Sequence, residues 1–491
     1  MTTIDVIDPL TGDKLHEIDA HSASDVALRF LEASKAQKAW GSMAPRERAR
    51  IASRISDAVA ANQEQLMDVL QRETGKSRAH AFEEVTGALG AIAYYAKITP
   101  GAMRRTKVKA GVPFMLSAYV EPAPVGVVGI ITPWNYPLAL TMMDVIPALM
   151  AGNAVVQKAD NQTALTVQMA RELAVGAGIP AEVWTVVHGD PTEVGNAVTD
   201  NADYVAFTGS TPTGKLVAQR AASRLIGYSL ELGGKNPMIV LPGADLEKAA
   251  ESAIGGAFGN SGQLCVSIER LYVPNHAIKD FETILKRRVE TLTLGVSNSF
   301  DYDLGALSSA NQLTRVSQFV ERAIAEGARV VTGGRVMDEI GPNFFAPTVL
   351  TDIPLGAEIL HKEVFGPVIA LVGYDSLDEA VELANATEFG LNASVFGDRK
   401  LGIKTASRLM AGSVNVNEGY RATMASMAAP MGGMKQSGMG RRSGVNGLLR
   451  FTESRTIGVA NKSPIGLPTR AKQYKFMAPV MTKLVRLMGK L

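Results

Sequence analysis

Cysteine is almost absent from this chain of 491 residues, which contains only Cys265. A single cysteine excludes an internal disulfide and is typical of proteins in a reducing compartment. The six histidines are scattered, and no pair of them has the spacing of metal ligands. We therefore predict that the protein holds no metal.

Three further features are missing from the sequence. The net charge is only +2, whereas binding to nucleic acid needs a basic excess, so we expect no nucleic-acid partner. No run approaches the roughly 20 apolar residues of a membrane-spanning helix. Residues 1–8 carry acids and no apolar stretch with a cleavage site, so we expect no secretory signal and a cytoplasmic location.

The chain is long enough for more than one substructure. Residues 25–40, which Ser24 could cap, and residues 46–73 have apolar side chains at helical spacing. From residue 125 onward, short apolar runs alternate with helical patterns, which predicts an α/β fold with a parallel sheet and crossover helices. The apolar runs are 125–131, 153–157, 183–187 and 204–207.

A second alternating block begins near Gly233 and Gly234. It has strand-like residues at 238–241 and 270–273, and helical patterns at 246–258 and 277–292. Residues 112–121 and 451–460 are apolar and β-prone but fit neither block. We expect them to form strands that pack outward, against another subunit.

Cys265 is the first candidate for chemistry. A lone cysteine is more often a buried, inert side chain than a nucleophile. Here it ends a small and polar run, residues 259–265 (GNSGQLC), that interrupts a helical pattern. Such a run presents a thiol to a cleft, and an exposed backbone amide beside it could hold a developing oxyanion.

Two polar side chains could assist a cysteine nucleophile. Glu231, between two leucines and before a glycine pair, could be a general base if burial raised its pKa. Its other interpretation is a surface residue paired with Lys235. Asn135 directly follows an apolar strand, where α/β proteins build their sites, and could donate to an oxyanion or simply satisfy a turn.

Residues 209–214 (GSTPTG) are the signal for a cofactor. They form a glycine-bounded turn between a strand and a helix, and the free amides of a helix N-terminus bind pyrophosphate well. The spacing is not the usual G-x-G-x-x-G, so the signal is weak when taken alone. Lys158 ends a strand and could reach an adenosine ribose, or could extend its ammonium group into solvent.

Six segments occur together in an order that resembles the aldehyde dehydrogenase superfamily, and the resemblance covers nearly the whole chain. They are 132–137 (TPWNYP), 207–210 (FTGS), 231–235 (ELGGK), 262–265 (GQLC), 363–367 (EVFGP) and 430–433 (PMGG).

The resemblance implies a Rossmann-like nucleotide-binding domain, an α/β catalytic domain and a small β oligomerisation element, in a homodimer or homotetramer. It places the nucleotide domain at residues 1–109 and 125–233, and the catalytic domain at 234–433. The oligomerisation element is expected at 110–124 and 434–460, followed by a tail at 461–491.

The resemblance also implies a mechanism. Cys265 would attack the aldehyde, Asn135 and the Cys265 amide would hold the oxyanion, and Glu231 would activate water to hydrolyse the thioester. Glu363 would hold the nicotinamide ribose. The residues expected to contact the cofactor are Thr132, Trp134, Asn135, Lys158, Ala159, Asp160, Asn161, Gly209, Ser210, Leu232, Glu363 and Phe365.

The family separates its two cofactors near Lys158. Members that prefer NAD usually have a glutamate where this chain has Asn161. A neutral amide does not repel a 2'-phosphate, which favours NADP over NAD. Asp160 opposes that inference unless it caps the helix that follows.

Residues 158–163 (KADNQT), 265–270 (CVSIER) and 434–438 (MKQSG) resemble succinate-semialdehyde dehydrogenases, especially the actinobacterial ones. The better-known members hold the substrate carboxylate with two arginines, where this chain has Met143 and Gly259. We expect Arg421 and Ser426 to hold it instead, with Tyr136 also contacting the substrate. A broad aliphatic or aromatic range is the alternative, because Met142, Met143 and Met424 could line an adaptable pocket.

The tail, residues 461–491, is basic and has apolar residues at helical spacing. Such a helix more often packs on its own oligomer, and adsorption to an anionic membrane is the alternative. Two other classes of protein also stay open: a nucleotide-binding scaffold without catalysis, and a cysteine hydrolase or acyltransferase that uses no dinucleotide.

Overall fold

A computed structural model describes residues 3–110, 116–461 and 470–488 of the chain. Their contacts divide the chain into two compact units. Unit 1 comprises Met1–Ala102 and Pro124–Glu453, and unit 2 comprises Met103–Ala123 and Ser454–Leu491.

Unit 1 begins with a hairpin and four helices. Ser22, rather than Ser24, caps the first helix, because its Oγ accepts a hydrogen bond from the Asp25 N–H and the Asp25 carboxylate bonds back to the Ser22 N–H. Asn62 interrupts the pattern at 46–73, which forms two helices. The elements are β1 (Thr3–Ile7), β2 (Lys14–Asp19), α1 (Ala23–Ser42), α2 (Pro45–Ala61), α3 (Gln63–Thr74) and α4 (Arg78–Ala102).

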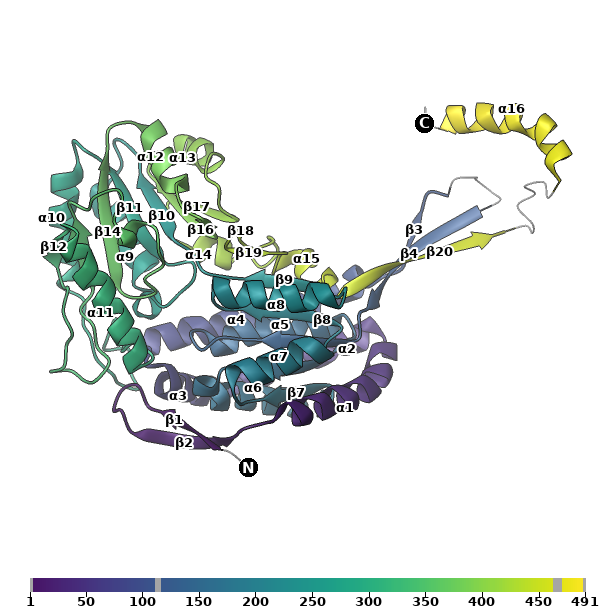
Figure 1. Cartoon of the computed structure of the whole chain (residues 1–491), viewed down its shortest axis with the longest axis horizontal. Coiled ribbons are helices and arrows are strands. Elements are labelled where there is room, and N and C mark those ends of the chain that lie inside the picture. The colour runs from purple at the N-terminus through teal and green to yellow at the C-terminus, as the bar shows by residue number, and fades with distance from the viewer. Residues whose placement is uncertain (1–2, 111–115, 462–469, 489–491) are drawn as a thin grey trace. The chain divides into compact units, whose positions relative to one another are not determined.

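The first sheet is parallel except for one short edge strand. Its order is β19 (Gly438–Met439), β9 (Gly227–Glu231), β8 (Tyr204–Thr208), β5 (Val127–Ile131), β6 (Ala154–Lys158) and β7 (Trp184–Val187). The helices between these strands are α5 (Pro137–Met150), α6 (Ala164–Gly176), α7 (Pro191–Asn201) and α8 (Thr211–Ser223) (Figure 1).

The chain runs from β5 outward to β7 and then returns to build β8 and β9 on the other side of β5. Ligands of open α/β sheets bind outside the carboxyl ends of the strands at such a reversal of strand order. Lys158 and Glu231 are the last residues of β6 and β9. Asn135 and Gly209 lie in the loops that follow β5 and β8. The sheet therefore brings them to one edge.

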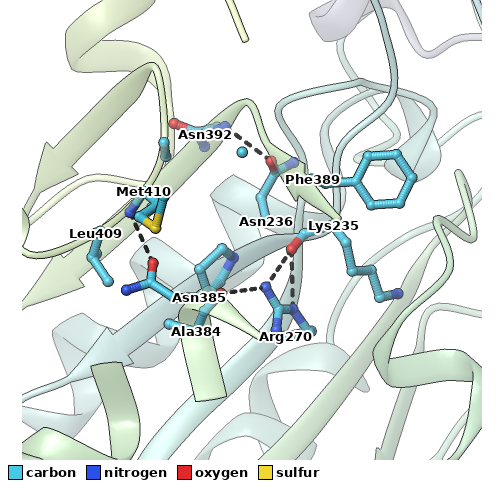
Figure 2. Close-up of a pocket in the computed structure, with 13 residues that line it drawn as sticks. Lys235, Asn236, Arg270, Ala384, Asn385, Phe389, Asn392, Leu409 and Met410 are labelled. Carbon is cyan, nitrogen blue, oxygen red and sulfur yellow. Dashed lines mark hydrogen bonds between the residues drawn. The ribbon is translucent and has the colours of Figure 1, made fainter. Parts of the chain in front are cut away.

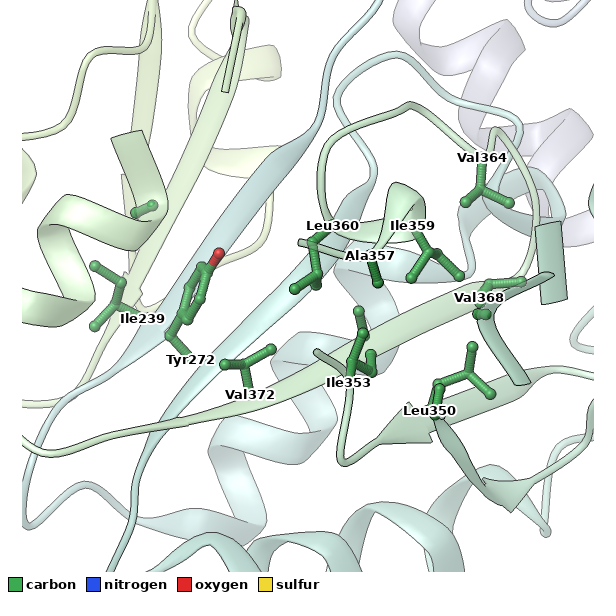
Figure 3. Close-up of a cluster of buried hydrophobic side chains, with 14 of the residues drawn as sticks. Ile239, Tyr272, Leu350, Ile353, Ala357, Ile359, Leu360, Val364, Val368 and Val372 are labelled. Carbon is green, nitrogen blue, oxygen red and sulfur yellow. The ribbon is translucent and has the colours of Figure 1, made fainter. Parts of the chain in front are cut away.

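The second sheet of unit 1 has seven strands. Its order is β12 (Arg329–Thr332), β13 (Thr348–Thr351), β14 (Val368–Tyr374), β11 (Ile268–Pro274), β10 (Asn236–Val240), β16 (Asn392–Phe396) and β17 (Ser413–Val416), and only β12 is antiparallel to its neighbour. Buried side chains of several strands and their covering segments form one hydrophobic core, of which Figure 3 shows Ile239, Leu350 and Val372.

Further helices and short pieces complete unit 1. They are α9 (Leu246–Ala257), α10 (Ile278–Val289), α11 (Ala310–Ala325), α12 (Leu377–Asn385), α13 (Arg399–Ala406), α14 (Arg421–Met424) and α15 (Gly444–Leu449), the 3-10 turns η1 (Asn161–Thr163), η2 (Gly259–Gly262) and η3 (Glu358–Leu360), and the paired strands β15 (Phe389–Gly390) and β18 (Met434–Lys435).

Unit 2 contains a three-stranded sheet in the order β20 (Thr452–Ala460), β4 (Leu116–Pro124) and β3 (Thr106–Val108), followed by α16 (Ala471–Met488). Glu121 on β4 forms ion pairs with Arg105 and Arg455. The two β-prone segments that fitted neither α/β block thus meet in one sheet, although residues 111–115 of the first lie outside the described residues.

Residues 434–453 belong to unit 1 by their contacts, because β19 pairs with β9 and α15 packs against α4 and α5. The C-terminal segment of the compact second unit begins at Ser454, whereas the expected oligomerisation element begins at 434. Among the described helices, none is long and apolar enough to cross a membrane.

A substitution of Leu350 would test whether the hydrophobic core of the second sheet is assigned correctly. This leucine lies on β13 and is fully buried, so Leu350→Ala should lower the free energy of unfolding by about 2–5 kcal/mol through lost packing and a residual cavity. Leu216→Ala on α8, where the leucine is 60% exposed, should change it by less than about 0.5 kcal/mol. Equal effects in urea unfolding would contradict this assignment of the core.

Candidate active site

Cys265 lies in the wall of a pocket of about 430 Å³ in unit 1, and its side chain is partly exposed. Asn135 and Tyr136 line the same pocket, as do residues from α4, α5 and α14. Most of the lining is apolar, and its charged members are Glu83, Glu84, Arg421 and Arg442. The thiol therefore faces a space large enough for a small organic substrate.

The loop before Cys265 has an unusual backbone. After α9, residues Asn260, Ser261 and Gly262 take left-handed conformations with φ of 51°, 53° and 74°. Only glycine fits the third position, because a Cβ there would lie 2.0 Å from the Gly366 carbonyl oxygen. This turn ends the helical pattern and leads the chain to Cys265.

Asn236 fixes the other side of that loop. Its Nδ2 donates to the carbonyl oxygens of Cys265 at 2.8 Å and Ser267 at 2.7 Å, and its Oδ1 accepts from the Asn392 N–H. Figure 2 shows Asn236 beside Arg270, which donates to the Lys235 carbonyl. The cavity among these groups is about 10 Å³, which holds one water at most. The contacts of Asn236 are therefore structural, and we call them the joint at Asn236.

Asn135 reaches across to the cysteine loop. Its side-chain Nδ2 donates to the Gln263 backbone carbonyl at 3.0 Å. The backbone carbonyl of Asn135 accepts from Lys76 Nζ at 2.9 Å and from Asn260 Nδ2 at 3.0 Å. An amide nitrogen carries two hydrogens, so one N–H of Asn135 is left for a ligand.

Lys76 and Glu84 form a buried ion pair that the sequence analysis did not identify. Glu84 also accepts from the N–H groups of Leu138 and Ala139, at the start of α5. The pair joins α4 to α5 and holds the carbonyl of Asn135. No local sequence signal reveals it, because the groups that Glu84 joins lie far apart in the chain.

Glu231 ends β9 and is buried, and neither of its carboxylate oxygens has a hydrogen-bond partner within the described part of the chain. Burial raises its pKa to about 7, against the opposing pull of Arg442 and Arg450. The side chain can therefore gain or lose a proton near neutral pH.

A buried charge network lies beside Glu231. Asp144 accepts from both Arg442, at 2.9 and 2.6 Å, and Arg450. Arg442 also donates to Thr208 Oγ1 at 2.6 Å, and Thr208 is the strand partner of Glu231. Two arginines and one aspartate leave one positive charge, which the ionised Glu231 balances.

Burial raises the pKa of the Cys265 thiol to about 12, and the carboxylates of Glu363 and Glu231 act in the same direction. The same cause raises the pKa of Glu363 to about 7, although Glu363 accepts a hydrogen bond from the Gly234 N–H at 2.8 Å. The thiol is therefore protonated in this arrangement and needs a nearby base to become a nucleophile.

The expected adenosine-side residues lie at the carboxyl ends of β6 and β8. Lys158 Nζ bonds the Ala159 carbonyl at 3.1 Å, and burial lowers the pKa of this lysine. Asp160 caps η1 by accepting from the Gln162 N–H, and Asn161 exchanges two hydrogen bonds with the Gly189 backbone. Asp160 is thus engaged in capping.

The turn at Gly209 and Ser210 starts α8. Ser210 is exposed and caps the helix, and the first turn of α8 contains no acid. Leu232 packs against Gly214 in the same helix, where a Cβ would lie 2.5 Å from the Leu232 side chain. An uncovered helix start without acids fits a pyrophosphate.

The expected nicotinamide-side residues also gather in unit 1. A Cβ on Gly233 would lie 2.6 Å from Glu363 Oε2, so these two segments approach closely. Trp134 and Phe365 contact edge to face with ring centroids 5.6 Å apart. Thr132 Oγ1 accepts from Gln157.

The expected substrate residues are only partly brought together. Arg421 lines the pocket, but its guanidinium is paired with Glu83 at 2.8 Å. Ser426 is exposed, bonds the Ala422 carbonyl and is not among the pocket residues. Met142 is likewise absent from the lining, whereas four other methionines contribute to it: Met143, Met424, Met427 and Met431.

Gly262 tests the backbone of the cysteine loop. Gly262→Ala should slow alkylation of Cys265 by iodoacetamide and lower the melting temperature, because the left-handed φ and the contact with Gly366 displace the loop. Gly195→Ala is the control, since a Cβ at this site in α7 meets no atom within 4 Å. An unchanged alkylation rate in Gly262→Ala would contradict the proposed strain.

Comparison with known proteins identifies the chain's relatives. The model of the Aldehyde dehydrogenase family matches residues 1–457. "Putative succinate-semialdehyde dehydrogenase (NADP+) 2" of Mycobacterium ulcerans is 44% identical over 99% of this chain and 95% of its own length. 3-sulfolactaldehyde dehydrogenase of Pseudomonas putida is 36% identical over 93% of each chain.

Solved structures agree. The crystal structure of an E. coli NADP-dependent enzyme superposes with a TM-score of 0.90 at 33% identity, covering 94% of this chain and 95% of the other. The expected α/β architecture and the resemblance noted from the six segments are both confirmed. The chain belongs to the aldehyde dehydrogenase family.

Proposed function

We propose that this protein oxidises an aldehyde to a carboxylic acid with NADP, through a covalent intermediate on Cys265. The observation that carries the proposal is the position of the only thiol. Cys265 opens into a pocket beside the amide of Asn135 and is electrostatically coupled to the buried, unpartnered Glu231. A scaffold without catalysis would not need a carboxylate buried in this way.

Catalysis begins when Cys265 Sγ bonds to the aldehyde carbon. The thiol does not ionise unaided, because burial raises its pKa, so its proton would pass to the Glu231 carboxylate and from there to solvent before the hydrolytic step. The remaining N–H of Asn135 and the backbone N–H of Cys265 stabilise the oxygen that becomes negative. The joint at Asn236 keeps the cysteine backbone in place during this step.

NADP, when bound, supplies the acceptor for the hydride of the aldehyde carbon. Lys158 and Asn161 would hold its adenosine side, the start of α8 at Ser210 its pyrophosphate, and Glu363 its nicotinamide ribose. Ala159, Leu232 and the Trp134–Phe365 pair would complete the walls.

Glu231 then takes a proton from water, whose oxygen attacks the thioester carbon and releases the acid from Cys265. A pKa near 7 leaves a useful share of the carboxylate ionised at neutral pH. Neither oxygen has a hydrogen-bond partner among the residues that the structure describes, so both are available to orient the water.

NADP is preferred in this proposal because Asn161 carries no charge and Asp160 is occupied by η1. The Mycobacterium ulcerans relative is also named for NADP. NAD is the weaker alternative, because nothing at Asn161 grips two ribose hydroxyls as a carboxylate does.

Succinate semialdehyde is the first candidate substrate, since the relative at 44% identity is named for it. Arg421 is the proposed partner of its carboxylate, which would have to displace Glu83. An aliphatic or aromatic aldehyde is the second candidate, favoured by the four methionines of the pocket.

We further propose that residues 1–109 with 125–233 bind the dinucleotide and that 234–433 supply the nucleophile. The sheet of unit 2 would join subunits into a dimer or tetramer, because a three-stranded sheet leaves edges that a second copy can pair. A cytoplasmic location is part of the same proposal.

The substrate proposal is tested by kcat/KM for succinate semialdehyde, hexanal and benzaldehyde with each cofactor. Cys265→Ala should be inactive with all of them. Arg421→Ala should raise the KM for succinate semialdehyde at least about tenfold and leave that for hexanal unchanged, because it removes a charged partner. An unchanged KM for succinate semialdehyde would show that the Arg421 assignment is wrong.

The proposal also predicts a pH dependence. Glu231 works only when ionised, so kcat should fall as the pH drops below about 7. Arg450→Met removes a positive charge that favours the ionised form and should move the midpoint upward by roughly one pH unit. Asp144 would keep Arg442 as its partner in this variant.

Two variants serve as controls for that measurement. Arg455→Met removes an exposed arginine in unit 2 and should leave the midpoint unchanged. Glu231→Gln should abolish the acidic limb together with most of the rate. If the pH midpoint of kcat in Arg450→Met were unchanged or lower than in the unmodified protein, the role given to Glu231 would be refuted.

A further inference from the structure

The last helix, α16, stands apart in composition from the rest of the chain. Residues 462–491 contain seven basic residues and no acid, so the 461 residues before them hold a net charge of −5 although the whole chain has +2. The family match ends at residue 457, before this segment begins. Catalysis by the shared fold therefore does not account for it.

The cations and the large apolar residues of α16 lie on different sides of its axis. At about 100° per residue, Lys472, Lys475, Lys483 and Arg486 fall within an arc of about 80°. The large apolar residues occupy the opposite arc of about 180°. Those with described side chains are Tyr474, Phe476, Met477, Val480, Met481, Val485 and Leu487.

The apolar arc of α16 is exposed. Phe476 is 81% and Val480 64% accessible, and Tyr474, Val485 and Leu487 are also exposed. Pro479 lies in the polar arc, so the backbone carbonyl of Lys475 that it leaves without a helical partner is on the side of the cations.

We propose that α16 lies on an anionic lipid bilayer, with its apolar arc among the acyl chains and its cations at the headgroups. A large apolar face opposite a purely basic one is the pattern of helices that lie in a membrane interface. The helix of 18 residues carries four cations and is not apolar enough to cross a bilayer, so we place it along the membrane surface.

A second copy of this chain is the rival occupant. Its other surface would have to supply acids for four adjacent cations, and α16 contains none with which to build a reciprocal pair. Anionic headgroups supply that charge along the entire helix, at about a fivefold gain in affinity for each cation. Charge complementarity therefore favours the bilayer.

The test is co-sedimentation of the full-length protein with vesicles. Binding should be strong with phosphatidylglycerol in the vesicles, weak with phosphatidylcholine alone, and reduced by salt. Lys475→Gln with Lys483→Gln should weaken it at least about tenfold. Phe476→Ser with Val480→Ser should also abolish most of it, because less apolar surface enters the bilayer.

Helix α13 provides matched controls in unit 1. Lys400→Gln with Lys404→Gln removes the same charge, and Leu401→Ser with Ile403→Ser alters exposed apolar residues, yet both pairs should leave binding unchanged. Aldehyde oxidation should survive every tail variant, so failure of this proposal is distinguishable from failure of the proposed function.

Three outcomes would overturn the proposal. The first is sedimentation that the two tail variants do not reduce. The second is equal binding to single-stranded DNA, which would indicate a general polyanion surface. The third is a protein lacking residues 462–491 that changes its oligomeric state by analytical ultracentrifugation, while the full chain binds no vesicle.

Discussion

Burial of a carboxylate without a partner is the constraint on which the proposed chemistry depends. A buried ionised group is unfavourable unless its surroundings compensate, and for Glu231 the neighbouring positive charge of the Asp144, Arg442 and Arg450 network does so without a hydrogen bond. That balance leaves its pKa near 7 instead of far above it. Glu231 is near enough to raise the pKa of the thiol, and the network favours its ionised form.

In contrast to Glu231, the buried polar groups around the site have ion-pair or hydrogen-bond partners. Lys76 pairs with Glu84, Lys235 pairs with Glu269, and Asn236 uses both ends of its amide. Removing one partner from such a pair leaves an uncompensated charge, so each contact strongly favours a single geometry. The rigid joints therefore hold Asn135 and Cys265, while the reactive carboxylate is left without bonds.

Much of the fold and part of the site could be predicted from the sequence. The apolar runs that became β5 to β8 were recognisable because strands buried on both faces are continuously apolar, and short segments singled out Cys265, Asn135 and Glu231 as candidates. Arg442 was not, because its partners Asp144 and Thr208 are distant in the chain. Ser426 was a candidate only by its loop, and its hydroxyl bonds a local carbonyl instead.

The pocket also contains a charged side chain whose partner matters, but here the charge is positive and the partner is already present. Arg421 offers a cation to a substrate, but Glu83 already neutralises it at the rim, where both side chains are partly exposed. A substrate carboxylate can replace Glu83 only if the released acid reaches water, and this exposure permits that. An apolar aldehyde needs no such exchange, since the methionines adapt to its shape. Under the proposed function, substrate choice would therefore depend on the free energy of separating Arg421 from Glu83, more than on the presence of a cation.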